Sequence, residues 1–315
     1  MKVTKFLTLA LCGATFFASC SSDNEPIADE VVIPITVSAP EAISRAVGGT
    51  NSAVGGLGNV DMTKFDLRYI IEVYNEAGTK LAVDRIVKTF DTYQSLSQDV
   101  RLTAGRKYKF VAWVDFVAQG STADLHYNTA AGLDKITFNT NAINDESRDA
   151  YTGVVTDLPT ALTIEAKRPF GKLRVVTDDA AKLSFSEKVA KVTVTYSTSS
   201  RIPAGYNAVT QTASTTDVTP TALSADLATY TNDTDVAKTL MVDYIFAGAT
   251  TQYVKFNITA LTDGGTEIYT RSVNADVPVT ANTLTSVKGS VLTANATVSV
   301  SVSDSFTSTE DKTVE

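Results

Sequence analysis

Residues 65–74 read FDLRYIIEVY, and this stretch decides the fold. Apolar side chains recur at every second position. Polar residues take most of the positions between them. Because successive side chains of a β-strand point to opposite faces, a period of two places the apolar set on one face. The stretch therefore predicts a strand with one face on a hydrophobic core; that face holds Phe65, Leu67, Tyr69, Ile71 and Val73.

The same alternation returns along the chain, and no stretch keeps a helical period for long. It is found in residues 108–116, 190–196, 240–246 and 254–260. Turn-forming residues separate these runs: residues 75–78 (NEAG) and 263–266 (DGGT) are typical of hairpins, because glycine tolerates the positive φ of tight turns. Many short strands joined by such turns predict an all-β fold of antiparallel β-sandwiches.

The chain is long enough for two such domains. Residues 167–170 read KRPF, and Pro169 suits a strand entry or a domain junction because it cannot donate to a sheet. We expect an N-terminal sandwich over residues 31–165 and a C-terminal sandwich over residues 166–315.

The N-terminus has the pattern of an export signal. Two lysines precede an apolar run that is too short to span a bilayer, and small residues follow it. Residues 1–19 are therefore predicted to be a signal peptide that ends before Cys20. A cysteine at that point resembles the bacterial lipoprotein signal, in which the thiol is lipidated, and residues 20–30 would form an acidic tether. An ordinary secretory signal with an incidental cysteine is the alternative.

Composition and residue types argue against several function classes. The chain has 35 acidic and 27 basic residues, which disfavours binding to nucleic acid. It has one histidine, His126, which we expect at the surface or in a turn, and its second cysteine lies in the leader, so neither a nucleophile–base pair nor a zinc cluster is indicated. The acidic pairs at 145–146 and 178–179 are expected to be solvated. We predict that the chain is not an enzyme and needs no metal or cofactor.

Four segments together resemble the fimbrillin-like lipoproteins of the Bacteroidetes. They are residues 65–74 (FDLRYIIEVY), 108–115 (YKFVAWVD), 149–153 (DAYTG) and 167–173 (KRPFGKL). The resemblance implies two tandem transthyretin-like β-sandwich domains after a lipoprotein signal peptide. It also implies a lipidated precursor from which an arginine-specific protease removes the first strand, after which subunits polymerise by donating strands to one another.

The residues allow such a mechanism. Arg45–Ala46 follows the first strand and precedes a glycine-rich stretch, which makes it the candidate cleavage site. The alternative is that Arg45 is an ordinary loop arginine.

Two strands could exchange. The leaving strand would carry Val31, Ile33, Ile35 and Val37, and Pro34 should limit its pairing along one edge. The donor candidate carries Val298, Val300 and Val302, alternating with serine and threonine. An uncharged strand of this kind could add to a neighbour's sheet or close the sheet of its own domain, and both alternatives stay open.

We therefore expect a structural subunit of a cell-surface fimbria, held at the outer membrane by lipid on Cys20 until processing moves it into the fimbrium. Its partners would be other fimbrial subunits, with a host or glycan ligand left open. The alternatives are a surface lipoprotein that binds glycans and a fimbrial anchor or accessory subunit. The single tryptophan, Trp113, lies in an alternating strand and is expected to pack in a core rather than to form a sugar platform.

Overall fold

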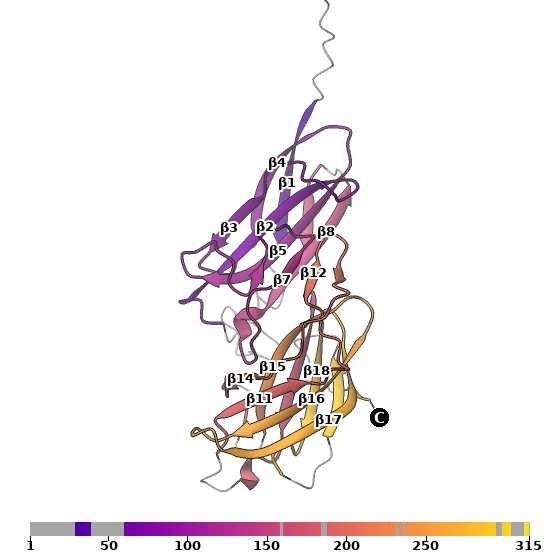
Figure 1. The fold of residues 1–315 in the computed structure, drawn as a ribbon. Helices are drawn as coiled ribbons and strands as arrows, with labels where there is room; N and C mark the ends of the chain where they lie inside the picture. The colour runs from indigo at the N-terminus through magenta and orange to yellow at the C-terminus, as the bar shows by residue number, and fades with distance from the viewer. Residues whose placement is uncertain are drawn as a thin grey trace, which may run out of the picture.

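The computed structural model describes residues 29–38, 60–157, 160–183, 188–230, 233–234, 237–293, 298–303 and 312–314. In these residues the protein is all-β, as the sequence predicts, with short 3-10 helices η2 (Glu146–Arg148) and η3 (Ala180–Lys182). Figure 1 shows two sandwiches stacked along the long axis of the molecule. None of the helices in the described residues has the length and apolar character needed to cross a bilayer.

The first sandwich packs two sheets on each other. One has the strand order β4 (Leu96–Thr103), β1 (Glu30–Ser38) and β9 (Leu162–Glu165). The other has the order β3 (Ile86–Phe90), β2 (Phe65–Asn75), β5 (Tyr108–Ala118) and β8 (Ala150–Asp157). Their inner faces share one core, to which Leu67, Tyr69, Ile71 and Val73 belong, so the strand face predicted from the alternation in β2 is confirmed.

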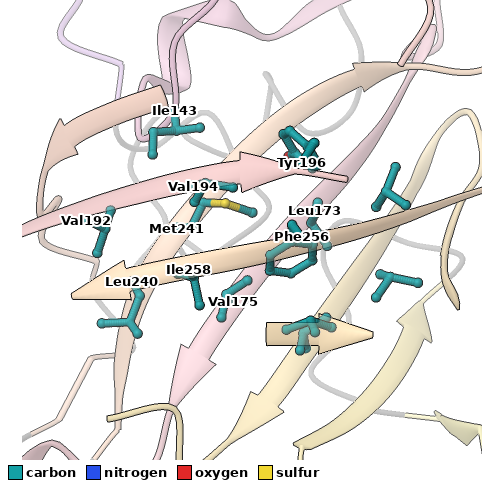
Figure 2. Close-up of a cluster of buried hydrophobic side chains, with 14 of the residues drawn as sticks. Ile143, Leu173, Val175, Val192, Val194, Tyr196, Leu240, Met241, Phe256 and Ile258 are labelled. Atoms are coloured by element: carbon teal, nitrogen blue, oxygen red, sulfur yellow. The ribbon is translucent and has the colours of Figure 1, made fainter. Parts of the chain in front are cut away.

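The second sandwich is built in the same way. One sheet has the order β15 (Lys238–Phe246), β10 (Phe170–Thr177), β18 (Thr283–Gly289), β19 (Val298–Ser303) and β20 (Lys312–Val314). The other has the order β14 (Leu223–Asp226), β11 (Lys191–Tyr196), β16 (Gln252–Leu261) and β17 (Glu267–Val279). Figure 2 shows the core between them, with side chains from β10, β11, β15 and β16 and with Ile143 from the preceding half of the chain.

Both predicted hairpin turns join antiparallel strands, as the sequence predicts. Residues 263–266 join β16 to β17, and Gly265 has the positive φ of 80° that favours glycine there. At the end of β2, Gly78 has a φ of 72° and donates its amide to the Asn75 carbonyl; the bridge Tyr74–Leu81 follows, and the chain then pairs antiparallel with β2 as β3.

A small sheet and a third hydrophobic cluster join the two halves. The sheet has the order β13 (Thr212–Ala213), β12 (Gly205–Asn207), β7 (Ile136–Phe138) and β6 (Tyr127–Asn128), so segments from both sides of residue 165 pair with each other. The cluster contains Trp113, Tyr127, Phe170 and Phe246. Trp113 is fully buried, as its strand pattern predicts.

Candidate assembly site

Strand β1 occupies the middle of its sheet. It pairs antiparallel with β4 from Glu30 to Val37 and parallel with β9 from Ile35 to Ser38. Ile33, Ile35 and Val37 point into the core and are at most 1% exposed. A strand from the start of the chain therefore fills a slot between two neighbours that come from later in the sequence.

The pairing of β1 is complete on one side only. Its N-terminal half faces β4 alone, and pairing with β9 begins at Ile35, directly after Pro34. This register agrees with the prediction that Pro34, which has no N–H, limits pairing along one edge. Val31 is half-buried and packs against the edge of the core. The C-terminal half of β1 is thus held by two strands and the N-terminal half by one.

Removal of β1 would leave a groove between β4 and β9. The groove would be lined by core side chains that now contact β1, which include Leu96, Val100 and Leu102 of β4 and Leu162 and Ile164 of β9. Each large aliphatic side chain withdrawn from a core loses about 1.5–3 kcal/mol of burial free energy. Two unpaired strand edges would also face each other across the gap, which is a template for another strand.

The walls of this slot are set by a close approach at Gly153 in β8. An added Cβ there would lie 2.6 Å from Cγ2 of Ile164 and 2.7 Å from the carbonyl oxygen of Glu165. Only glycine lets β9 pass this close to β8. The residue therefore fixes where β9 stands beside β1.

The second candidate strand, β19, lies in the sheet of its own sandwich in this structure. It pairs with β18 over its whole length, from Val298 opposite Gly289 to Ser303 opposite Leu284. On its other side β20 pairs with residues 300–302. Val298 and Val300 are partly buried against the second core. The three valines of the donor candidate thus lie in the sheet of their own sandwich in the single chain.

Three residues singled out in the sequence cannot be placed. Cys20, the predicted lipidation site, lies outside the described residues, as do Arg45 and Ala46 of the predicted cleavage site. Of the described residues, Ser38 at the end of β1 lies nearest to Arg45 along the chain.

A buried charge cluster lies where the two sandwiches meet, and the sequence predictions missed it. Arg148 of η2 donates to Oδ1 of Asp243 in β15 at 2.7 Å, and Lys172 of β10 donates to Oε2 of Glu146 at 2.7 Å. Although burial alone lowers it, the Asp243 carboxylate raises the pKa of Arg148. Burial lowers the pKa of Lys172, and Glu146 opposes that shift.

A third pair sits at the junction itself. Arg168 holds both carboxylate oxygens of Asp149, at 2.6–2.9 Å, and its guanidinium lies over the ring of Tyr151. Burial works against the charged form, but Asp149 outweighs it and raises the pKa of Arg168. The signal for such pairs is a lone charge within an apolar run, as at Lys172 and Asp243.

His126 lies in the bend before β6, but the expectation that it is at the surface is wrong, because this side chain is 6% exposed. Its Nε2 lies 2.8 Å from Oγ of Ser147, and Ser147 Oγ in turn donates to Asp145 at 2.5 Å. Since the serine proton goes to Asp145, Nε2 must be the donor to Ser147. A catalytic relay needs the carboxylate on the other ring nitrogen and the serine proton aimed at the histidine, so this arrangement is structural.

The prediction that the acidic pairs 145–146 and 178–179 are solvated is also wrong for one member of each pair. Glu146 is 7% exposed and Asp179 is fully buried. Asp179 accepts the backbone amide of Leu292 and the hydroxyl of Thr293, which satisfies it without solvent. Among the described side chains, no three His, Cys, Asp or Glu residues gather in a way that could hold a metal ion.

The described residues thus define an all-β protein of two joined sandwiches, with its first strand set into the core of the first. The chain belongs to a family of unknown function, DUF6562, whose model matches residues 24–315. The search of curated proteins found no match.

Solved structures similar to this chain include two fimbrial proteins of Porphyromonas gingivalis. The tip fimbrial protein Mfa3 is 12% identical with a TM-score of 0.47, over 87% of this chain and 99% of its own. The fimbrial anchor protein Mfa2 is 11% identical with a TM-score of 0.43, over 87% of this chain and 97% of its own. Fimbrial proteins, to which the sequence resemblance pointed, are therefore among the similar structures.

Proposed function

We propose that this protein is a structural subunit of a cell-surface fimbria. It is exported as a precursor lipidated at Cys20, and it polymerises when cleavage after Arg45 releases β1 and a strand from a second copy takes its place. The observation that carries the proposal is the position of β1: an N-terminal strand that forms the middle of a sheet, with three core side chains, between strands of later sequence.

The proposal assigns a role to the two halves of β1. The N-terminal half of β1 pairs with β4 alone, so its other edge, next to Pro34, is free. An incoming strand can begin to pair at that edge and then displace the rest of β1. Stepwise replacement of this kind avoids exposure of the whole core at once. The donor is β19 of a second copy, which must first leave β18 and β20 of its own sheet.

The test is treatment of the purified precursor with an arginine-specific protease. The expected result is a new N-terminus at Ala46 and high-mass polymers seen by size-exclusion chromatography and electron microscopy. Arg45→Ala should abolish both. Arg106→Ala, an exposed arginine in the turn after β4, is the matched control and should change neither.

A peptide experiment identifies the donor without altering the fold. A synthetic peptide of residues 296–315, added during cleavage, should occupy the groove and cap growing polymers. The same peptide with Val298, Val300 and Val302 replaced by serine should not. Polymers that are insensitive to the valine peptide would assign donation to another segment.

The rival reading is a surface lipoprotein that captures glycans, or an anchor subunit that keeps its lipid. Glycan capture is favoured by an exposed aromatic platform, whereas Trp113 lies in the cluster between the sandwiches. A chain that is not cut at Arg45 and stays monomeric would overturn the fimbrial shaft proposal in favour of these roles.

A further inference from the structure

The second sandwich holds a cavity of about 730 Å³ at the edge where β14 and β15 end their sheets. It lies away from β1 and plays no part in the proposed strand exchange. Pockets that bind small organic molecules are of this size and have mostly apolar walls with few polar groups. The cavity is therefore large enough to take a ligand rather than single waters.

The walls of the cavity are core side chains. Val189, Leu240 and Leu292 belong to the second hydrophobic cluster and are buried, while Leu183 and Leu227 pack against it from the rim. Leu240 is seen at the margin of this cluster in Figure 2. An apolar group in the cavity would thus contact the same surface that closes the core.

The charged side chains that line the cavity differ in whether they already have partners among the described residues. Lys188 and Lys238 line it, and neither forms an ion pair with another described residue. The lining carboxylate of Asp233 is already engaged, since Oδ1 accepts the Thr239 amide at 2.8 Å and Oδ2 faces the Tyr230 amide at 3.4 Å. The two lysines outnumber the one lining carboxylate, so the described lining has a net positive charge in a chain of net charge −8.

Two further titratable groups lie near the cavity. Asp179, below the floor formed by Leu292, is satisfied by backbone amides and hydroxyls. Tyr230 is 2% exposed, and burial, followed by the neighbouring Glu146 carboxylate, raises its pKa, so it is neutral. Its hydroxyl lies beside the Glu146 carboxylate.

We infer that this cavity binds an amphipathic carboxylate, with its apolar chain against the leucine-lined wall and its head group between Lys188 and Lys238. A free fatty-acid-like molecule fits better than a membrane surface, because the acidic chain as a whole is repelled by anionic lipid and the leucine wall is continuous with the core. The inference does not depend on the proposed fimbrial role.

The test uses the uncleaved full chain and titration calorimetry with dodecanoate. Saturable binding to one site is expected, and the melting temperature should rise with ligand concentration. Lys188→Gln combined with Lys238→Gln should weaken binding about tenfold or more, because charged hydrogen bonds to the head group are lost. Lys182→Gln, an exposed lysine of η3 outside the lining, should leave it unchanged.

Further experiments test the role of the apolar chain and distinguish a free amphiphile from lipid in a membrane. Butyrate, which keeps the carboxylate but lacks the long chain, should bind far more weakly. Ala180→Phe, which fills the cavity from its rim, should block dodecanoate while both lysines remain. Absence of saturable binding, equal binding to the double lysine variant, or binding only to phosphatidylglycerol vesicles would each overturn the inference. None of these readouts involves polymerisation, so failure here leaves the fimbrial test untouched.

Discussion

Arg148 contacts several groups at the junction with its guanidinium, although the side chain is buried. It pairs with Asp243 and also reaches Oδ1 of Asn141 and the carbonyl of Tyr244. Arg148→Ala would leave Asp243 buried without its partner, and breaking a buried pair from one side costs about 3–5 kcal/mol. Urea unfolding should show a loss of this size.

A matched exposed pair controls for the loss of an arginine. Arg101 contacts Glu30 at 3.1 Å, with side chains 72% and 57% exposed. Exposed pairs contribute about 0–1 kcal/mol because water and salt screen them. Arg101→Ala should therefore change the unfolding free energy little. Equal losses in the two variants would contradict a structural role for the Arg148–Asp243 pair.

His126 makes the fold sensitive to mild acid. Burial is the main cause that lowers its pKa from 6.5; Asp145 opposes the shift and Arg148 adds to it. The unfolded chain therefore binds the proton before the folded chain does, so stability is complete above 6.5 and falls as the pH drops below it. His126→Gln should flatten the dependence of unfolding free energy on pH between about pH 7.5 and about pH 5.5. An unchanged slope would show that His126 does not control it.

At the scale of single elements, Gly153 decides whether β9 can stand beside β1. Gly153→Ala forces a Cβ against Ile164 and the backbone of Glu165. Overpacking of this kind costs about 1–3 kcal/mol, and we expect a matching fall in thermal stability. Gly264→Ala, in the β16–β17 turn with its nearest atom 3.9 Å away, is the control and should be close to neutral.

Loss of β1 should weaken the first sandwich without unfolding the second. Withdrawal of Ile33, Ile35 and Val37 removes roughly 5 kcal/mol or more of burial free energy. A cleaved monomer, trapped at low concentration, should therefore unfold at lower urea than the precursor. Addition of the residue 296–315 peptide should restore the midpoint. A cleaved monomer as stable as the precursor would mean that β1 is not part of the folding core.

At the scale of the whole molecule, the two sandwiches should unfold together. The shared cluster stacks Phe170 of β10 on Phe246 of β15, with ring centroids 4.7 Å apart, and Trp113 of β5 packs on Tyr127 at 5.3 Å. Trp113 fluorescence reports on the shared cluster, whereas far-ultraviolet circular dichroism reports on the strands of both sandwiches. The two probes should give one coincident transition in urea. Two separate midpoints would show that the halves fold independently.

The sequence alone predicts the strands, but it does not predict which side chains are buried on their second faces. A period of two in FDLRYIIEVY predicts the face of β2 that packs in the first core, and that face is confirmed. The opposite face carries Arg68 and Glu72, which alternation alone would leave in water. Both are buried: Arg68 pairs with Asp115 at 2.6 Å, and Glu72 pairs with Arg85 at 3.2 Å. Their partners lie elsewhere in the sequence, in β5 and directly before β3, and a local pattern carries no information about them.

The same distinction between local and long-range information applies to the candidate site. The period, the length and Pro34 identify β1 as an unusual strand, because these properties are local. That β1 lies between β4 and β9 depends on pairing over long sequence separations. The same holds for His126, whose environment comes from Thr140 and Ser147 rather than from its immediate neighbours.

The junction also bears on how a filament of such subunits would respond to pulling. Asn144, with a φ of 58°, holds the edge of β15 through its amide and side chain, and it donates to the carbonyl of Asp226 at the end of β14. Buried ion pairs and stacked rings lie beside it. A subunit clamped in this way has no internal hinge at that point, so shear flow would bend a fibre mainly at the contacts between subunits, and the elasticity of the fibre would be set there.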